Sequence, residues 1–457
     1  MKTLLIKFDN SFFVRNFFRT DVFFVLKQKT DLQLVFLAPR EKVEYYRKEF
    51  SSERVIFDVL PETRFFVSER FFRFIETASI HSHTVTLLQK TDFVRTRGQK
   101  WLLKRMAIYA MRRILWRLGR FSWWREAIRV AYRILPSNTF AGVLEKWKPD
   151  LVYCPSMMYT DFRLLKEAKK RTIPTIGMIL SWDNLHSKTI LRVFPSHLMV
   201  HTSDTMEQVW RYTDFPRERM HVTGIPQYDR YFRKTGIMGR DEFIKSIGGD
   251  TSKKLILYAV SGKAGLHIDF GIIRMIGDGM REGEIQKDVQ VFLRAHPRYD
   301  FSPEKIRHIK DDLGCLVMPA MSHVGQGRDS WEFDKHTISF LNNTLAHADA
   351  VIALYTTFFI EAAIFDKPLI AVGFDEREVS YWDSAKRFFD WDHLRELDAL
   401  KGIWRVQSRK ELFEAIAMSL KFPERMKEGR ARIVNKQAQF TDGKSGERVA
   451  EVIKNFL

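Results

Sequence analysis

The chain has 457 residues, of which 45% are hydrophobic and 14% aromatic, so it can bury a sizeable core and is not a disordered protein. It contains only two cysteines, Cys154 and Cys315, which argues against a disulfide framework or a cysteine-based metal site. The net charge of +19 predicts an anionic partner, such as a phospholipid surface, a nucleic acid or a phosphorylated substrate.

The amino-terminal half alternates short apolar runs with amphipathic stretches, which predicts parallel strands joined by helices. The predicted strands are residues 3–8, 32–38, 54–59, 151–154, 175–180, 197–201 and 220–223. The predicted helices include residues 40–50, 161–171 and 203–212. We expect Ser203 to cap the last of these, with Glu207 close to capping-box spacing.

A strongly basic stretch from Lys90 to Arg133 interrupts this alternation, with thirteen lysines and arginines against two acidic residues. Its apolar residues recur at roughly helical spacing, which favours a helix in the headgroup region of an anionic membrane. They are Trp101, Leu102, Ile108, Met111 and Leu115. The alternative is a domain helix with a solvated basic face and its aromatic side chains in the core. No RRM, KH, zinc-finger or helix-turn-helix pattern is visible, so we do not expect nucleic acid as a partner.

Residues 234–254 are polar and contain glycine, as is typical of a linker, and the alternation restarts after them. Further strands are predicted at 254–260, 289–294, 315–318 and 350–354, a helix at 268–282, and helices from 410 onward. The predicted fold is therefore α/β, with two Rossmann-like doubly wound domains facing a cleft. The expected domains are 1–233, with the basic helical insertion at about 90–135, and 254–440, followed by a helix at 441–457.

Two loops of the second half follow predicted strands, where α/β proteins bind ligands. Ser261, Gly262 and Lys263 follow the first strand; small residues let backbone amides approach a phosphate, and Lys263 adds positive charge. Arg294 and His296 follow the next strand, and Pro297 stiffens that turn. Cationic donors there would stabilise the negative charge that develops on a diphosphate leaving group.

A third loop lies between the strand at 350–354 and the strand that restarts at Pro368. It contains Thr356 and Thr357, and the short helix after it carries Glu361 one turn in. An ordinary crossover with Glu361 facing solvent is the alternative interpretation. The order of the three loops predicts a nucleotide diphosphate site.

In the first half, the run S-W-D-N-L-H-S-K at 181–188 follows a predicted strand. Asp183 and His186 at that strand end could orient and deprotonate an acceptor hydroxyl, because a general base must reach the proton it removes. The alternative is a turn capped by Asp183.

Two short patterns are weak indications of a metal site. His81 and His83 form a lone H-x-H, and Asp390 and Asp392 have the D-x-D form, but we expect Asp392 to cap a helix instead. Walker, G-x-S-x-G and H-E-x-x-H motifs are not found. We therefore predict no metal site and no cofactor.

The loops of the second half resemble the nucleotide-binding unit of GT-B type glycosyltransferases and of the related CDP-glycerol glycerophosphotransferases. The resemblance covers roughly residues 254–456 and is carried by Ser261-Gly262, His296-Pro297, Thr356-Thr357 and Glu361-Ala362. It implies that Glu361 holds the ribose hydroxyls, while His296 and the Ser261 loop face the diphosphate.

Two runs of the first half extend this resemblance. The run at 181–188 resembles the acceptor-side loop of some surface-polysaccharide transferases, which gives Asp183 and His186 a catalytic role. The run from Gly224 to Asp229 resembles the interdomain hinge of the same group, with Asp229 in a structural role. The domain at 1–233 is thus expected on the acceptor side and the domain at 254–440 on the donor side.

The resemblance implies a glycosyltransferase of polysaccharide biosynthesis that moves a sugar from a nucleotide-activated donor to a hydroxyl of a glycan or lipid-linked acceptor. Three alternatives remain: transfer of a polyol phosphate from a CDP-linked donor, a UDP-sugar 2-epimerase reaction, and a noncatalytic membrane-associated binding protein. The first ten residues are too short an apolar run for a signal peptide, and no stretch is long enough for a membrane span. We expect a cytoplasmic enzyme, peripheral on the inner face of the cell membrane through its basic insertion.

Overall fold

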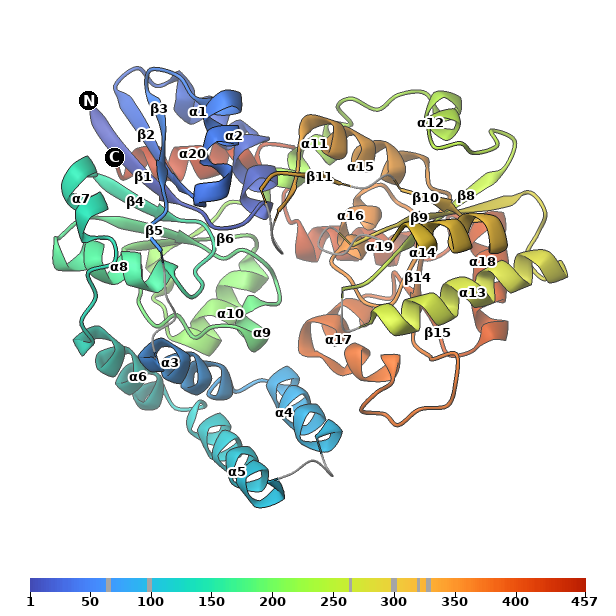
Figure 1. Cartoon of the computed structure of the whole chain (residues 1–457), viewed down its shortest axis with the longest axis horizontal. Coiled ribbons are helices and arrows are strands. Elements are labelled where there is room, and N and C mark those ends of the chain that lie inside the picture. Colours follow the sequence, from blue (N-terminus) through green and yellow to red (C-terminus); the bar gives the residue numbers. More distant parts are fainter. Residues whose placement is uncertain (63–66, 97–100, 263–264, 297–301, 319–320, 326–329) are drawn as a thin grey trace. The chain divides into compact units, whose positions relative to one another are not determined.

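The structure is a computed structural model that describes residues 1–62, 67–96, 101–262, 265–296, 302–318, 321–325 and 330–457. The chain divides into two compact units (Figure 1). Unit 1 comprises Met1–Asp229 and Gln439–Leu457, and unit 2 comprises Arg230–Ala438. Each unit contains its own parallel sheet with helices around it, which confirms the predicted α/β class with two Rossmann-like domains.

The sheet of unit 1 has seven parallel strands in the order β3-β2-β1-β4-β5-β6-β7. The strands are β1 Lys2–Lys7, β2 Leu32–Ala38, β3 Val55–Val59, β4 Leu151–Cys154, β5 Thr175–Met178, β6 His197–Val200 and β7 Met220–Val222. Their interiors are almost wholly apolar because helices cover both faces of a parallel sheet. The order reverses between β1 and β4, so the loops after these two strands diverge at the carboxyl edge.

One face of this sheet is covered by a cluster of aromatic rings centred on Phe18. Its ring lies 4.5 Å from that of Phe50 and 4.7 Å from that of Phe36, and the cluster extends over β1, β2 and β3. Each buried ring contributes about 1.5 to 3 kcal/mol by leaving water, and aromatic pairs add about 0.5 to 1.5 kcal/mol. The cluster comprises Phe8, Phe13, Phe17, Phe18, Phe23, Phe36, Tyr46, Phe50 and Phe57.

The helices of unit 1 connect these strands, and the last helix of the chain packs against α1. They are η1 Val14–Phe18, α1 Asp21–Gln28, η2 Arg40–Lys42, α2 Val43–Phe50, α3 Val67–Ala78, α4 His83–Arg95, α5 Leu102–Leu118, α6 Ser122–Ile134, α7 Ala141–Trp147, α8 Asp161–Lys170, α9 Asn184–Ser187, α10 Ser203–Thr213, η3 Arg217–Arg219, η4 Pro226–Tyr228 and α20 Ser445–Asn455. The helix α11 Asp229–Phe232 begins at the boundary between the units.

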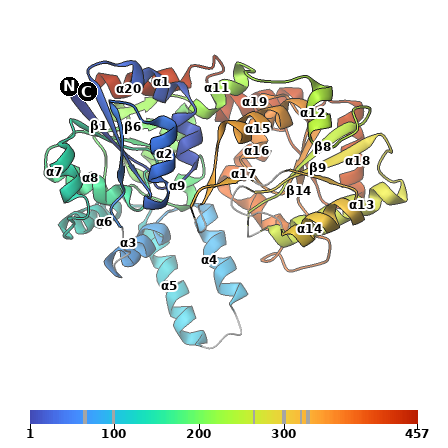
Figure 2. The ribbon, with the colours of Figure 1, turned by 45° about the horizontal axis from the view of Figure 1, so that its top comes forward.

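The basic insertion forms helices α4, α5 and α6, which follow α3. In both views α4 and α5 lie side by side and extend away from the sheet of unit 1 (Figure 2). Buried ion pairs hold α3 to the body: Arg192 reaches Glu76 at 2.9 Å and Glu69 at 3.0 Å, and Arg163 reaches Glu69 at 3.0 Å. Removing one partner would leave a buried charge uncompensated, so this network fixes where the insertion starts.

The sheet of unit 2 has six parallel strands in the order β10-β9-β8-β13-β14-β15, and β11 and β12 form a separate antiparallel pair. The strands are β8 Lys254–Ala259, β9 Val289–Arg294, β10 Leu316–Val317, β11 Ser322–His323, β12 Trp331–Glu332, β13 Ala350–Ala353, β14 Leu369–Val372 and β15 Trp404–Val406. The helices are α12 Arg240–Ser246, α13 Leu266–Glu282, α14 Pro303–Arg307, η5 His308–Asp312, α15 Lys335–His347, α16 Phe358–Ile364, η6 Ala385–Asp390, α17 Asp392–Asp398, α18 Arg409–Lys421 and α19 Lys427–Gln437.

Both predicted helix caps are wrong. The cap of α10 is Thr202, whose hydroxyl accepts a hydrogen bond from the Thr205 amide, whereas Ser203 is already the first helical residue. Asp392 is likewise the first residue of α17, and Trp391 precedes it without a side-chain cap. In each case the helix begins one residue from the expected position, and cap geometry is sensitive to that single residue.

Asp229 has the structural role expected of it. Its carboxylate accepts hydrogen bonds from the backbone amides of Ser445 at 2.9 Å and Gly446 at 2.7 Å, at the start of α20. An anionic side chain satisfies exposed amides at a helix amino terminus and favours its positive dipole end. The contact ties residues 439–457 into unit 1.

Candidate functional site

The carboxyl edge of the unit 2 sheet is the first candidate site. The strand order reverses between β8 and β13, so the loops that follow these two neighbouring strands emerge together at one edge. Open α/β sheets bind ligands at such a reversal point. The Ser261 loop follows β8, and the Thr356–Thr357 loop follows β13.

The Ser261 loop is held by a buried carboxylate that the sequence did not indicate. Asp269 in α13 accepts hydrogen bonds from the Ser261 amide at 2.9 Å and from the Ser261 hydroxyl. Its other oxygen accepts the Tyr258 hydroxyl at 2.9 Å. Burial raises the pKa of Asp269 to about 7, because the three hydrogen bonds only partly offset the loss of solvation. Ser261 therefore shapes the loop, and its own amide and hydroxyl are already engaged.

Gly265 lets the loops after β8 and β13 approach each other. A Cβ atom at this position would collide with Ser261 Oγ and would lie 3.2 Å from Tyr355 Cε1. Tyr355 in turn stacks on Phe388 with 3.9 Å between ring centroids, and Trp391 packs edge-on at 5.6 Å. The site edge thus carries a partly exposed aromatic ring, a surface on which a nucleobase can stack.

The end of β9 brings a cation to the same edge. The Arg294 guanidinium lies 4.6 Å from the centre of the Phe358 ring, which opens α16 after β13. His296, two residues beyond, is partly buried. Lys263 and Pro297 lie outside the described residues, and the other member of the first loop, Gly262, is half-buried.

The loop after β13 places its two threonines differently. Thr356 Oγ1 accepts a hydrogen bond from the Phe358 amide at 3.1 Å and so helps to start α16, whereas Thr357 is exposed. Glu361 is 4% exposed, and its Oε2 accepts a hydrogen bond from the Tyr231 hydroxyl at 2.6 Å. The alternative interpretation required Glu361 to face solvent, and the burial of its carboxylate shows that it does not. A ribose hydroxyl at Glu361 would compete with Tyr231.

The two candidate residues of the predicted acceptor loop in unit 1 differ in their exposure to solvent. Asp183 precedes α9, is partly exposed and forms an ion pair with Lys188 at 2.7 Å. His186 is 1% exposed, and its ring packs against Tyr212 with centroids 5.4 Å apart. Such burial favours a core position for His186, whereas Asp183 has the accessibility that a general base needs.

Sequence reasoning missed Asp269, Tyr231 and Tyr355. Tyr231 lies 130 residues from its partner Glu361, and only the tertiary structure brings the two together. Tyr355 had a detectable signal, because it directly follows the apolar run of β13. Across the ranges that the structure describes, no three histidine, cysteine or acidic side chains are grouped as metal ligands would be.

A protein-family model described as CDP-Glycerol:Poly(glycerophosphate) glycerophosphotransferase matches residues 183–455. A search of curated proteins gives no match.

Several solved structures share the fold over the whole chain. The UDP-GlcNAc 2-epimerase from Methanocaldococcus jannaschii is 13% identical with a TM-score of 0.56, over 100% of both chains. The UDP-GlcNAc 2-epimerase from Neisseria meningitidis bound to UDP-GlcNAc is 13% identical with a TM-score of 0.54, also over 100% of both chains. A glycosyltransferase from Rickettsia africae is 9% identical with a TM-score of 0.50, over 100% of this chain and 98% of that one. At such identities the likeness establishes the two-domain α/β fold and not the reaction.

Proposed function

Because the chain belongs to the CDP-glycerol:poly(glycerophosphate) glycerophosphotransferase family, we propose that it transfers a polyol phosphate from a CDP-linked donor to a hydroxyl of a glycan or lipid-linked acceptor. The family match over residues 183–455 carries this proposal. The convergence of the loops after β8, β9 and β13 supports the carboxyl edge of unit 2 as the donor site.

In this reaction the acceptor hydroxyl oxygen attacks the phosphorus that bears the polyol. A new phosphorus–oxygen bond forms, the bond to CMP breaks, and the hydroxyl proton passes to a base. Asp183 is our candidate for that base, and Arg294 and His296 are our candidates for stabilising the phosphate charge. Tyr355 offers a ring for the base of the nucleotide.

The second candidate is transfer of a sugar from a nucleoside diphosphate sugar. It is favoured by the order of Ser261-Gly262, His296, Thr356-Thr357 and Glu361, which resembles GT-B glycosyltransferases. There the acceptor attacks the anomeric carbon, and the leaving group is a nucleoside diphosphate instead of CMP. The two reactions thus differ in the nucleotide that they release.

A product assay separates the candidates. The full chain is incubated with CDP-glycerol, CDP-ribitol or UDP-GlcNAc, with and without a glycerol phosphate oligomer, and the nucleotides are resolved by chromatography. We expect CMP from a CDP-polyol only when the acceptor is present. Release of UDP with acceptor would favour sugar transfer, and a 2-epimer formed from UDP-GlcNAc without acceptor would indicate an epimerase. No product under any condition, with no nucleotide binding, would contradict the enzymatic proposal.

We further propose that the hairpin formed by α4 and α5, residues 83–95 and 102–118, places the enzyme on an anionic membrane. Trp101 is 77% exposed and Leu103 is 82% exposed, values that a helix packed into a domain core would not show. Exposed cations lie along the same two helices and just after them: Lys90 and Arg95 in α4, Lys104 and Arg117 in α5, and Arg120 two residues beyond α5. Exposed apolar side chains interleaved with cations suit the headgroup region of anionic lipid. Among the described residues, no helix has the length and hydropathy needed to cross a bilayer.

The basic stretch contributes less surface charge than its composition suggests. Arg125 is buried in an ion pair with Asp214 at 2.5 Å, and Arg129 is buried against Phe194 with its guanidinium 4.2 Å from the ring centre. Both residues therefore pack inside the domain, which agrees with the domain helix of the alternative interpretation but not with the solvated basic face that it expected. That interpretation fits α6 better than the hairpin.

Liposome flotation tests the membrane proposal. Each cation near the surface contributes about 1 kcal/mol, so replacing Lys104, Arg117 and Arg120 by glutamine should weaken binding to phosphatidylglycerol vesicles by up to about a hundredfold. The effect should shrink as salt shortens the Debye length. The matched control replaces exposed lysines of unit 2 instead, namely Lys410, Lys421 and Lys427. Failure of the wild-type protein to float at low salt would make the hairpin a structural element only.

A further inference from the structure

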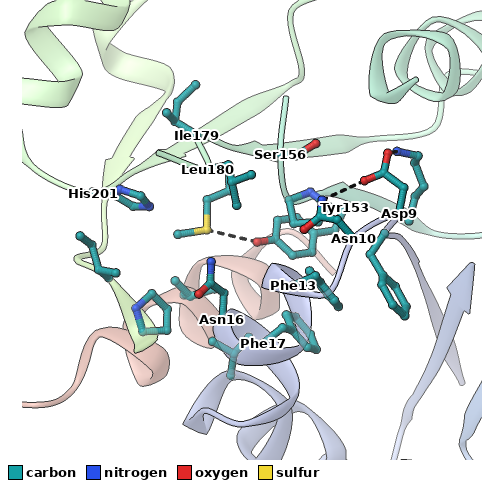
Figure 3. A pocket seen from close by; sticks show the side chains of 18 residues that line it. Asp9, Asn10, Phe13, Asn16, Phe17, Tyr153, Ser156, Ile179, Leu180 and His201 are labelled. Carbon is teal, nitrogen blue, oxygen red and sulfur yellow. Dashed lines mark hydrogen bonds and ion pairs between the residues drawn. The ribbon is translucent and has the colours of Figure 1, made fainter. Parts of the chain in front are cut away.

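Unit 1 contains a pocket at the point where its own strand order reverses. The pocket lies beyond the carboxyl ends of β1, β4, β5 and β6 and is partly open to solvent (Figure 3). The space between its protein atoms is about 550 Å³, a volume that includes open solvent at its mouth. It is separate from Asp183 and His186, which do not line it. Such reversal points are where α/β sheets bind ligands.

The charges at the rim of the pocket do not suit an anion. Lys7 is 1% exposed and lies between two carboxylates, with its Nζ 2.6 Å from Asp161 and 2.8 Å from Asp9. Burial alone would lower the pKa of Lys7, but the two carboxylates outweigh it and raise this pKa above its ordinary value. Among the described residues that line the pocket, Lys7 is the only lysine or arginine, and two carboxylates already engage it, so no uncompensated positive charge is available to a phosphate.

Two neutral polar side chains point into the pocket from different sides, as Figure 3 shows. His201, directly after β6, is 7% exposed, and its imidazole has no hydrogen-bond partner among the described residues. Burial lowers the pKa of His201 to about 4, so its ring is uncharged at neutral pH. Asn16 comes from the π-helix η1, and its buried Oδ1 has no partner within the described part of the chain. Buried polar atoms are rarely left unsatisfied, so Asn16 Oδ1 calls for a ligand or ordered water, and the uncharged His201 ring offers a second polar group beside it.

Apart from Asn10 and Ser156, which donate hydrogen bonds to Asp9 and Asp161, the remaining walls are apolar or aromatic. The rings of Phe13 and Phe17 stack with centroids 4.8 Å apart at the base of the pocket, and Leu180 lies at its partly exposed side. The Tyr153 hydroxyl donates to Met178 Sδ at 3.2 Å, a weak acceptor that an oxygen-bearing ligand would replace readily. Ligand pockets of this kind combine apolar surface with a few directed polar groups.

We propose that this pocket binds an uncharged, hydroxyl-rich group, a polyol or a sugar unit, with Asn16 and His201 as its hydrogen-bonding partners. Hydroxyl groups both donate and accept, so they match an amide and a neutral imidazole, while the carbon backbone of the ligand packs on the aromatic walls. Insofar as it rests on the proposed function, the group bound here is a unit of the acceptor.

Saturation-transfer NMR on the full chain tests the proposal with glycerol, ribitol and methyl β-D-glucopyranoside as neutral probes, and with glycerol 3-phosphate and inorganic phosphate as anionic probes. We expect at least one neutral probe to bind, and Asn16→Leu and His201→Phe each to raise its apparent Kd tenfold or more. Asn138→Leu and His221→Phe, which alter an exposed asparagine and a histidine outside the pocket, are the matched controls and should leave the Kd unchanged.

Leu180→Trp provides a second test should either pocket variant fail to fold, because it fills the pocket from its partly exposed side and should abolish the neutral probe's signal. Absence of binding by every neutral probe, tighter binding of the anionic probes, or unchanged affinity in the pocket variants would each overturn the proposal. CDP binding is measured in parallel and should survive all pocket variants. If the wild-type protein does not bind CDP, that result counts against the proposed function but leaves the result with the neutral probes unaffected.

Discussion

The buried carboxyl of Asp269 makes stability depend on pH in a way that can be calculated. Its pKa in the folded protein is about 7, against an ordinary value of 3.8, so the folded chain holds this proton more tightly than the unfolded chain. The stabilisation is complete below pH 3.8, declines as the pH rises, and is lost above about pH 7. Each pH unit within this window is worth about 1.4 kcal/mol, so going from pH 5 to pH 7 should remove about 2 to 3 kcal/mol.

Asp269→Asn isolates this effect, because asparagine resembles the protonated acid and does not titrate. We expect the free energy of unfolding of the wild type to fall relative to that of the variant by about 2 to 3 kcal/mol between pH 5 and pH 7. Above about pH 7 the difference between the two proteins should stay constant. Urea unfolding followed by tryptophan fluorescence measures the difference. Asp288→Asn, at an exposed aspartate of the same unit, is the control. A wild-type-to-variant difference that does not change between pH 5 and pH 7 would show that Asp269 does not titrate in this range.

The other predictions concern the candidate site. Glu361→Ala should weaken nucleotide binding by about 1.5 to 3 kcal/mol in calorimetry if the carboxylate accepts ribose hydroxyls, and unchanged affinity would remove it from the site. Asp183→Asn should slow turnover by about a hundredfold or more with donor affinity unchanged, and normal turnover would exclude it as the base. Gly265→Ala should destabilise unit 2 by about 1 to 3 kcal/mol in urea unfolding, because its Cβ would collide with Ser261; a stable variant would show that the loop can shift.

The strands could be predicted from sequence because their interiors are continuous apolar runs. The bounds of β2, β4 and β9 agree with the prediction to the residue. An aspartate precedes each of the three strands, and a proline follows β2 and β4. The polar stretch at 234–254, predicted as a linker, contains the helix α12. Two of its residues, Phe243 and Ile244, are buried, and this tertiary packing outweighs the polar composition.

The candidate site was predictable as a set of loops but not as a set of contacts. Parallel strands place their carboxyl ends at one edge, so Ser261, Arg294 and Thr356 could be grouped from the strand order alone. The partners that orient the site come from other elements. Tyr231 reaches Glu361 across 130 residues, and local sequence patterns carry no information on such pairs.

The burial of His186 also results from contacts with a distant part of the chain. Its loop is polar, yet α4 contacts α9, and the Ser82 hydroxyl donates a 2.6 Å hydrogen bond to the His186 carbonyl oxygen. That contact depends on where the insertion folds back. The pocket with Asn16 and His201 also escaped prediction, because its lining comes from the ends of β1, β4, β5 and β6 together.

Hydrogen–deuterium exchange of the full chain with and without CDP tests most directly where the donor binds. We expect slower exchange in peptides covering the loops after β8 and β13, around Ser261 and Thr356, and unchanged exchange around the unit 1 pocket at Asn16 and His201. Protection confined to unit 1, or no protection at a CDP concentration that saturates in calorimetry, would contradict a donor site on the unit 2 sheet.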